Sequence, residues 1–396
     1  MNNTIKLAVA AALLAGASSA NAGIMIPAGD WTLDIGGIVN AYYTSTRATG
    51  TATGLAGGND TGTKTASNIT TGLLPNYLSV SGKTRQNDLD VGFTISINPG
   101  ASTTQSGIQG GGSGTSTTPG TFGNQENRQA FLTFGDKSWG SFKLGKDLGI
   151  YASDAILNDM TLLGVGSGAG FLAGNTTTLG RIGTGFMYAD WKSQIAYSSP
   201  NWNGFSFTAG VTQAWNGTLN AQRGGSEPAY EGKASYEWAG DFGGKVWVSG
   251  ISQNIEQRND TANAFDIGAT INVAGFGLTG YYGQGEGTGT TVLFNGGYDA
   301  LGARDSDDWY VQATYTLPGV GTKLGASYGE STLDGSAVSQ ELENSMWVVG
   351  AYHPLTKHLN LVAEYSHVEG ELSALGPVAA TEGKAKTVSL GAILFF

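Results

Sequence analysis

The chain of 396 residues contains no cysteine, which excludes a disulfide framework, a thiolate metal site and a thiol nucleophile. Its formal net charge of −11 argues against nucleic acid as a partner. Glycine supplies 64 residues, roughly twice its usual share of ~7%, whereas charged residues make up 13%, about half the usual ~25%. This composition favours strands and turns over helices.

The first 22 residues have the three parts of a secretory signal peptide. Lys6 supplies a charged start, residues 7–17 form an apolar run, and the tripeptide ANA (20–22) is a cleavage site. The run is too short for a membrane-spanning helix, which needs ~20 residues, and a buried N-terminal helix is the weaker alternative. We therefore expect export and a mature chain that begins at Gly23. That chain has 19 basic and 31 acidic residues, a net charge of −12.

From Trp31 onward the chain repeats a unit in which apolar and polar residues alternate, the pattern of a strand with one apolar face. The clearest units are 31–45, 89–98, 205–212, 230–238, 265–273, 276–284, 309–317, 321–330, 357–368 and 385–396, and weaker ones are 73–83, 138–147, 244–254 and 343–353. Most have the ~9–11 residues of a strand that crosses a bilayer at a tilt. We count about sixteen strands up to Phe396.

The connections between these units alternate between short and long. Short Gly, Pro, Asn and Asp turns lie at 84–88, 135–140, 200–204, 239–244, 274–275, 318–321 and 354–357. Long connections lie at 47–72, 99–126, 148–183, 216–229, 285–306, 331–342 and 369–384, with a shorter member at 255–263. The Gly/Ser/Thr-rich stretch 100–123 is typical of a flexible surface loop. Such alternation predicts a barrel with short turns at one end and long loops at the other.

The predicted fold class is therefore all-β, with residues 23–396 forming one antiparallel transmembrane β-barrel. No apolar stretch after the signal peptide approaches ~18 residues, so an exported chain that spans a membrane has to do so as a closed barrel. A secreted β-rich adhesin is the soluble alternative, although no repeat of fixed period supports it. Aromatic residues near strand ends, among them Tyr42, Trp202 and Trp309, are typical of the girdles of membrane barrels.

The final strand, TVSLGAILFF, closes the predicted barrel. Its even-numbered side chains, from Val388 to Phe396, would face lipid or a neighbouring subunit. In a closed barrel this strand pairs with the first strand and leaves no free edge.

Motifs for catalysis and for metal or cofactor binding are absent from the sequence. It has no HExxH, CxxC, Walker-type glycine loop or EF-hand pattern, and GVGSGAG (164–170) fits a flexible loop better than a dinucleotide-binding loop. We therefore expect no cofactor, no metal and no enzyme activity. An outer-membrane hydrolase stays open as an alternative, because His353, His358 or His367 could pair with one of many serines.

Three stretches and the terminal Phe396 make the chain resemble the Gram-negative outer-membrane general porins. NRQAFLTFGD (127–136) and WGSFKLGKDLG (139–149) are similar to the family's strand–turn–strand before its third loop. GRIGTGFMYADWKSQIAYSSPNWNGFSF (180–207) is similar to the exit from that loop. The resemblance implies a homotrimer of water-filled barrels in the outer membrane, in contact with lipid and lipopolysaccharide. Each barrel would pass ions and small hydrophilic solutes by passive diffusion.

The resemblance also implies a constriction, in which the third loop (148–183) folds into the barrel and carries acids that face basic residues on the wall. The basic residues that match are Arg128, Lys146 and Arg181, and the acids are Asp154 and Asp159. Opposed charges across a narrow aqueous passage orient dipolar solutes and set ion preference. A solute-specific channel is the alternative, with Tyr281 and Tyr310 as an aromatic track for sugars.

Two further roles are implied by the resemblance at the chain ends. The assembly machinery of outer-membrane barrels reads a terminal Phe, here Phe396. The terminal carboxylate would also form an ion pair with the amino group of Gly23 across the closing seam.

Overall fold

The structure is a computed structural model that describes residues 23–56, 65–101, 125–172, 177–214, 227–292 and 295–396. The predicted signal peptide lies outside the described residues, as does most of the Gly/Ser/Thr-rich stretch 100–123. The prediction of a cleaved leader is therefore not tested.

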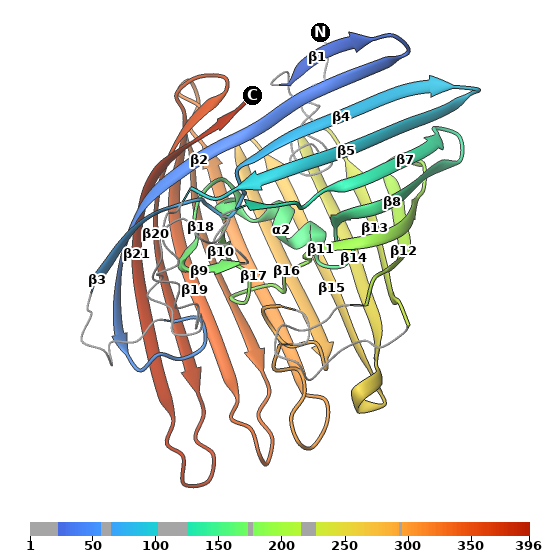
Figure 1. Cartoon of the computed structure of the whole chain (residues 1–396). Helices are drawn as coiled ribbons and strands as arrows, with labels where there is room; N and C mark the ends of the chain where they lie inside the picture. The colour runs from blue at the N-terminus through green and yellow to red at the C-terminus, as the bar shows by residue number, and fades with distance from the viewer. Residues whose placement is uncertain (1–22, 57–64, 102–124, 173–176, 215–226, 293–294) are drawn as a thin grey trace.

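Sixteen antiparallel strands form a closed barrel, as predicted (Figure 1). In chain order they are β2 (Trp31–Gly50), β4 (Tyr77–Gln86), β5 (Leu89–Pro99), β7 (Ala130–Asp136), β8 (Gly140–Leu148), β11 (Trp191–Ser198), β12 (Phe205–Thr212), β13 (Ala229–Trp238), β14 (Phe242–Ile255), β15 (Asp260–Val273), β16 (Phe276–Glu286), β17 (Asp305–Thr316), β18 (Lys323–Leu333), β19 (Leu342–Pro354), β20 (Leu359–Leu372) and β21 (Thr381–Phe395). The final strand pairs with the first, from Ile38 opposite Phe395 to Gly50 opposite Gly383.

Short accessory strands extend this ring at three places. β1 (Ile24–Ala28) forms a hairpin with the start of β2, in line with the end of β21. β3 (Thr65–Thr70) pairs with the second half of β2, and β6 (Gln125–Glu126) pairs with the end of β5.

The connections alternate as predicted. The short ones are 87–88, 137–139, 199–204, 239–241, 274–275, 317–322 and 355–358, and we call this end of the barrel the turn end. The longer ones leave the opposite end, the loop end, where only the connection at 256–259 is short. β1 and the end of β21 lie at the turn end (Figure 1).

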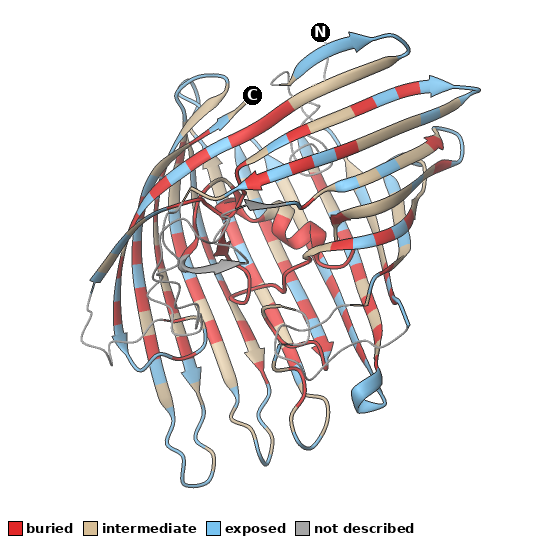
Figure 2. Ribbon diagram, viewed as in Figure 1, coloured by how far each residue is buried: buried red, intermediate tan, exposed pale blue. Residues whose placement is uncertain are grey.

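The two faces of the strands differ as they do in a protein surrounded by lipid. In β5 the side chains of Ile95 and Ile97 are exposed on the outside, whereas Thr94 and Ser96 are buried on the inside. In β21 the outward Val388, Leu390 and Leu394 are exposed, whereas Thr387 and Ser389 are buried. Exposed and buried positions alternate along most strands (Figure 2). An apolar exterior around a polar interior is the pattern of a transmembrane barrel.

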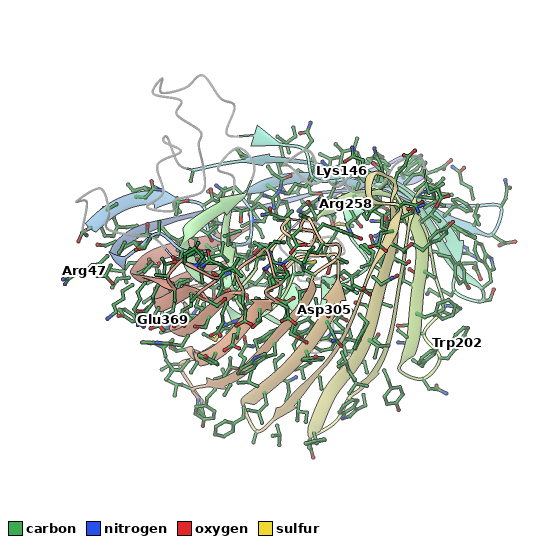
Figure 3. The ribbon with its side chains drawn as sticks, turned by 90° about the horizontal axis from the view of Figure 1, so that it is seen from below. Arg47, Lys146, Trp202, Arg258, Asp305 and Glu369 are labelled. Atoms are coloured by element: carbon green, nitrogen blue, oxygen red, sulfur yellow. The ribbon has the colours of Figure 1, made fainter. Side chains whose placement is uncertain are left out.

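Aromatic side chains gather outside the barrel near both ends. Towards the turn end lie the pairs Phe134–Phe142, Trp202–Phe205, Tyr236–Trp238 and Phe276–Tyr315, and towards the loop end lie Trp309–Tyr328 and Trp347–Tyr365. Trp202 projects away from the ring of strands (Figure 3). Such girdles match the two membrane interfaces. Tyr42, contrary to the prediction, does not belong to these girdles, because it faces inward and its hydroxyl donates to the carbonyl oxygen of Leu163.

The third loop (149–190) folds into the barrel, as predicted, but it has more internal structure than the sequence indicated. It contains the helix α2 (Ser153–Asn158), the 3-10 helix η2 (Met160–Leu163) and a hairpin of β9 (Ser167–Leu172) with β10 (Thr177–Gly180). Residues 164–170 therefore enter a strand and are not simply a flexible loop. Within the described part of the chain, no helix has the length and apolarity needed to cross a membrane.

The main hydrophobic core lies inside the barrel, between this loop and one part of the wall. The loop contributes Ala155, Ile156, Leu162, Val165, Leu179, Ile182, Phe186 and Tyr188, and the wall contributes Ile38, Tyr42, Trp247, Tyr281, Tyr310, Tyr352, Val362 and Ile393. Leu73 and Leu74 of the first long connection complete it. Burial of this apolar surface holds the third loop within the lumen.

Candidate pore constriction

Asp154 of α2 faces two lysines of the barrel wall. Lys233 on β13 and Lys245 on β14 both point inward, and the Lys233 ammonium lies 3.2 Å from one Asp154 carboxylate oxygen. Lys245 contacts the other oxygen of the same carboxylate. Burial alone favours the neutral carboxyl, but the two ammonium groups outweigh it and lower the pKa of Asp154. The carboxylate therefore stays ionised between two cations.

The accessibility of these groups is asymmetric. The side chain of Asp154 is only 2% exposed, whereas those of Lys233 and Lys245 are 27% and 25% exposed. Because both lysines are on the inner face of their strands, this exposed surface opens to the lumen.

A second pair on β8 has the same asymmetry. Lys143 contacts the carboxylate of Asp147 four residues further along the same face of the strand, with side-chain exposures of 31% and 5%. The amide of Gln129 donates to the other Asp147 oxygen over 3.0 Å. Asp147 is thus covered, and Lys143 is the accessible charge.

Lys146, predicted as a wall residue of the pore, lies on the opposite face of β8. Lys143 and Asp147 face inward, so Lys146 shares the outward face with Phe142 and Leu144, and its ammonium donates to the backbone oxygen of Asn127. The inward cation of this strand is Lys143, which is not among the predicted pore residues.

Arg181 and Asp159 are buried between the third loop and the wall. Arg181 follows β10 and is thus part of the loop, not of a wall strand as the resemblance implied. Its guanidinium donates to the carbonyl oxygens of Thr184 and Met346, and it lies over the ring of Tyr310. Both groups are almost inaccessible, so they do not border the lumen as the lysines do.

Asp159 caps η2 by accepting hydrogen bonds from the backbone amide and the hydroxyl of Thr161. Burial raises the pKa of its carboxyl, while the charge of Arg181 acts in the opposite direction. Arg128, which precedes β7, is also buried, and its guanidinium lies 5.7 Å from the centre of the Trp191 ring.

Phe396 and Gly23 occupy the closing seam. The backbone amide and carbonyl of Phe396 both bond to Gly37 on β2, and Ile24 lies opposite Ile35. The register therefore places Gly23 directly after Phe396 along the edge of β2. The ion pair between their terminal groups stays a prediction.

The aromatic track predicted for sugars is not accessible. Tyr281 and Tyr310 do face inward, but both are buried beneath the third loop, where Phe186 packs against their rings.

The comparisons with known proteins agree with this architecture. Residues 8–372 match the family model described as Gram-negative porin. The chain belongs to the Gram-negative porin family. A search of the curated proteins found no match.

Solved porin-like structures share the fold at low sequence identity. The anion-selective porin from Comamonas acidovorans is 16% identical, with a TM-score of 0.60 over 92% of this porin and 100% of that chain. The outer-membrane channel DcaP of Acinetobacter baumannii is 16% identical, with a TM-score of 0.62 over 93% of this porin and 99% of that chain. The outer-membrane protein OmpT of Vibrio cholerae, in a trimer form, is 14% identical, with a TM-score of 0.53 over 92% of this porin and 99% of that chain.

Family and barrel together make this porin an outer-membrane channel for passive diffusion. The turn end is accordingly the periplasmic end, and the loop end is the extracellular end.

Proposed function

We propose that the porin is a general diffusion channel with a preference for small hydrophilic anions. The observation that carries this proposal is the asymmetry of the lumen ion pairs. The side chains of Lys143, Lys233 and Lys245 are 25–31% exposed, whereas those of their carboxylate partners are 2–5% exposed. A solute that passes α2 thus meets ammonium groups, while the neutralising carboxylates lie behind protein.

The overall negative charge does not oppose this preference. A charge acts on a permeating ion only within a Debye length of about 8–10 Å, and low-dielectric walls focus the field of lumen groups. Many acids lie elsewhere, for example Glu341, Glu343, Glu371 and Glu382 at the extracellular rim. The lumen lysines therefore dominate at the constriction.

General diffusion is favoured over a sugar-specific channel because Tyr281 and Tyr310 are covered by the third loop. Attraction of anions to the constriction, by contrast, requires only the exposed ammonium groups of the lumen lysines.

A purely conducting role is favoured over a hydrolase. His353 bonds to the hydroxyl of Thr322, and His367 accepts from the indole of Trp347 on the outer face. Within the described part of the chain, no serine hydroxyl forms a hydrogen bond with a histidine, so the nucleophile–base pair of a hydrolase is not assembled there.

A homotrimer is the assembly we propose, since the related barrel of Vibrio cholerae OmpT is described as a trimer form. The apolar exterior fits contact with outer-membrane lipid and lipopolysaccharide, and the terminal Phe396 fits recognition by the assembly machinery. Migration as a trimer on an unheated gel, collapsing to a monomer on heating, would support this state.

The anion preference is tested in a planar bilayer that separates two KCl concentrations. The parent should give a zero-current potential of anion-selective sign. Lys143→Gln and Lys233→Gln should each lower the anion-to-cation permeability ratio about two- to fivefold, as expected for the loss of ~0.4–1 kcal/mol of screened attraction.

Lys146→Gln is the matched control, because it removes the same charge from the outer face of the same strand. It should leave the potential unchanged. A folded parent without conductance would contradict the channel itself, whereas a cation-selective parent would contradict only the proposed preference.

A further inference from the structure

We propose that Glu231 and Glu364 are positioning residues that fix the third loop at two points of the barrel wall and so set the width of the passage. This inference rests on the diffusion channel described above. It concerns buried carboxylates that do not border the lumen.

Glu231 on β13 holds the start of the loop. One of its carboxylate oxygens accepts the backbone amides of Ile150 and Tyr151 over 2.8 and 2.9 Å. The other oxygen accepts from the Lys192 ammonium over 2.6 Å and from the Thr212 hydroxyl over 2.8 Å. All four hydrogen bonds are buried. If one of them were lost, water could not readily take its place, and the buried polar group would be left without a partner.

Glu364 on β20 holds the middle of the loop. One carboxylate oxygen accepts the amides of Val165 and Gly166 over 2.7 and 2.9 Å, and the other accepts the hydroxyl of Tyr352 over 2.6 Å. Ser366 on the same strand donates to the carbonyl oxygen of Gly166 over 2.7 Å. The segment is thus held through both its amides and its carbonyl.

The two anchors stand on distant parts of the ring, with β14 to β19 between their strands. Between the two pairs of amides, the loop carries α2 and η2, and with them Asp154. A loop fixed at both places keeps α2 at a constant distance from Lys233 and Lys245. Loss of one anchor would let this segment move into or out of the passage.

The anchors differ in their charge balance. Glu231 is neutralised by Lys192, which is itself only 2% exposed, so Glu231→Gln would leave a buried ammonium without its partner. Among the residues that the structure describes, Glu364 has no cation within the 4.0 Å of a salt bridge, and neutral donors alone hold it. Glu364 is therefore the better site for a test, because its substitution exposes no second charge.

The first measurement is single-channel recording of Glu364→Gln. The amide oxygen of Gln can still accept the two backbone amides, but it is a weaker acceptor than a carboxylate, and this weakening should raise the ratio of closed or sub-conducting time to open time roughly fivefold, the factor that corresponds to about 1 kcal/mol. Glu364→Asp keeps the carboxylate and should restore part of the parental behaviour. Glu371→Gln, which removes an exposed carboxylate of the same strand, should behave as the parent.

The second measurement does not depend on conduction. Hydrogen exchange of the folded protein should show faster exchange at the amides of Val165 and Gly166 in Glu364→Gln, but not in Glu371→Gln. Parental gating together with parental exchange in a folded Glu364→Gln would overturn the proposal. A parent that exchanges as expected but does not conduct would contradict the channel and leave the anchor supported.

For Glu231, the double variant Glu231→Gln/Lys192→Met removes both buried charges, so misfolding from an unpaired ammonium is avoided. Faster exchange at Ile150 and Tyr151 is expected, and unchanged exchange there would exclude Glu231 as an anchor.

Discussion

At the scale of single residues, the direction of a side chain decides its role. Lys143 and Lys146 lie three positions apart on β8, yet they face opposite sides of the wall. The alternation of Phe142 and Leu144 with Ser141 and Lys143 contained this information, because Lys146 falls on the apolar face. The resemblance gave the right strand and the wrong face. Lys233, similarly, lies on the polar face that the alternation of β13 predicts.

A glycine next to the Glu364 anchor gives a sharp prediction at this scale. A Cβ atom at Gly164 would lie 2.1 Å from a carboxylate oxygen of Glu364. Gly164→Ala should therefore displace the carboxylate from the amides of Val165 and Gly166, at a cost of about 1–3 kcal/mol. Single-channel recording should show the same rise in closures as Glu364→Gln.

The double variant Gly164→Ala/Glu364→Gln should be no worse than either single variant, because both remove the same interaction. Gly280→Ala is the control, since a Cβ there meets no atom within 4 Å. Additive effects of the two substitutions would contradict a shared cause.

At the scale of elements, strands and turns could be predicted, whereas the internal structure of the third loop could not. Period-two patterns and Gly/Pro/Asn/Asp turns are local signals, and they located the short turns and all wall strands except β7 and β11, whose stretches were indicated only by the resemblance. The loop follows long-range contacts instead: Tyr310 bonds the carbonyl of Ala155, and Gln312 bonds the amide of Met160. No sequence pattern joins residues about 150 positions apart, so α2 and the β9–β10 hairpin were missed.

The last element, β21, gives a prediction for barrel closure. Phe396 exchanges two backbone hydrogen bonds with Gly37, over 2.7 and 3.0 Å. Deletion of Phe396 removes both, and it should destabilise the folded barrel by about 1–3 kcal/mol. The temperature at which the folded band disappears on a heated gel should fall. Phe396→Ala keeps the backbone bonds and should have a smaller effect on this temperature.

Phe242→Ala is the matched control, because it removes an exposed ring at the same end of the barrel but outside the seam. If the variant lacking Phe396 unfolded at the same temperature as Phe242→Ala, the backbone hydrogen bonds at the seam would contribute nothing measurable to the stability of the barrel.

At the scale of the whole molecule, the apolar exterior and the aromatic girdles define the part that lies in the membrane. Val311 on β17 is exposed on the outside, between Trp309 and Tyr315 of the two girdles. Exposed to water, such an apolar surface would cause the protein to aggregate. In a membrane it contacts lipid chains, so no apolar surface is exposed to water. The same chain thus has its hydrophobic core inside, around the third loop, and a second apolar surface outside.

Position along β17 should therefore set the effect of a charge on stability. Val311→Arg places a guanidinium in the apolar band and should lower the free energy of unfolding in liposomes by about 2–4 kcal/mol, the value for the bilayer midplane. Asp305→Arg places the same group beyond Trp309 at the extracellular end of the strand, where the cost should be about 0–1 kcal/mol. Urea titration of both variants in liposomes measures the difference. Equal effects at the two positions would mean that the girdles do not mark the membrane boundaries, because a band of lipid between them requires the cost to fall steeply towards the rim.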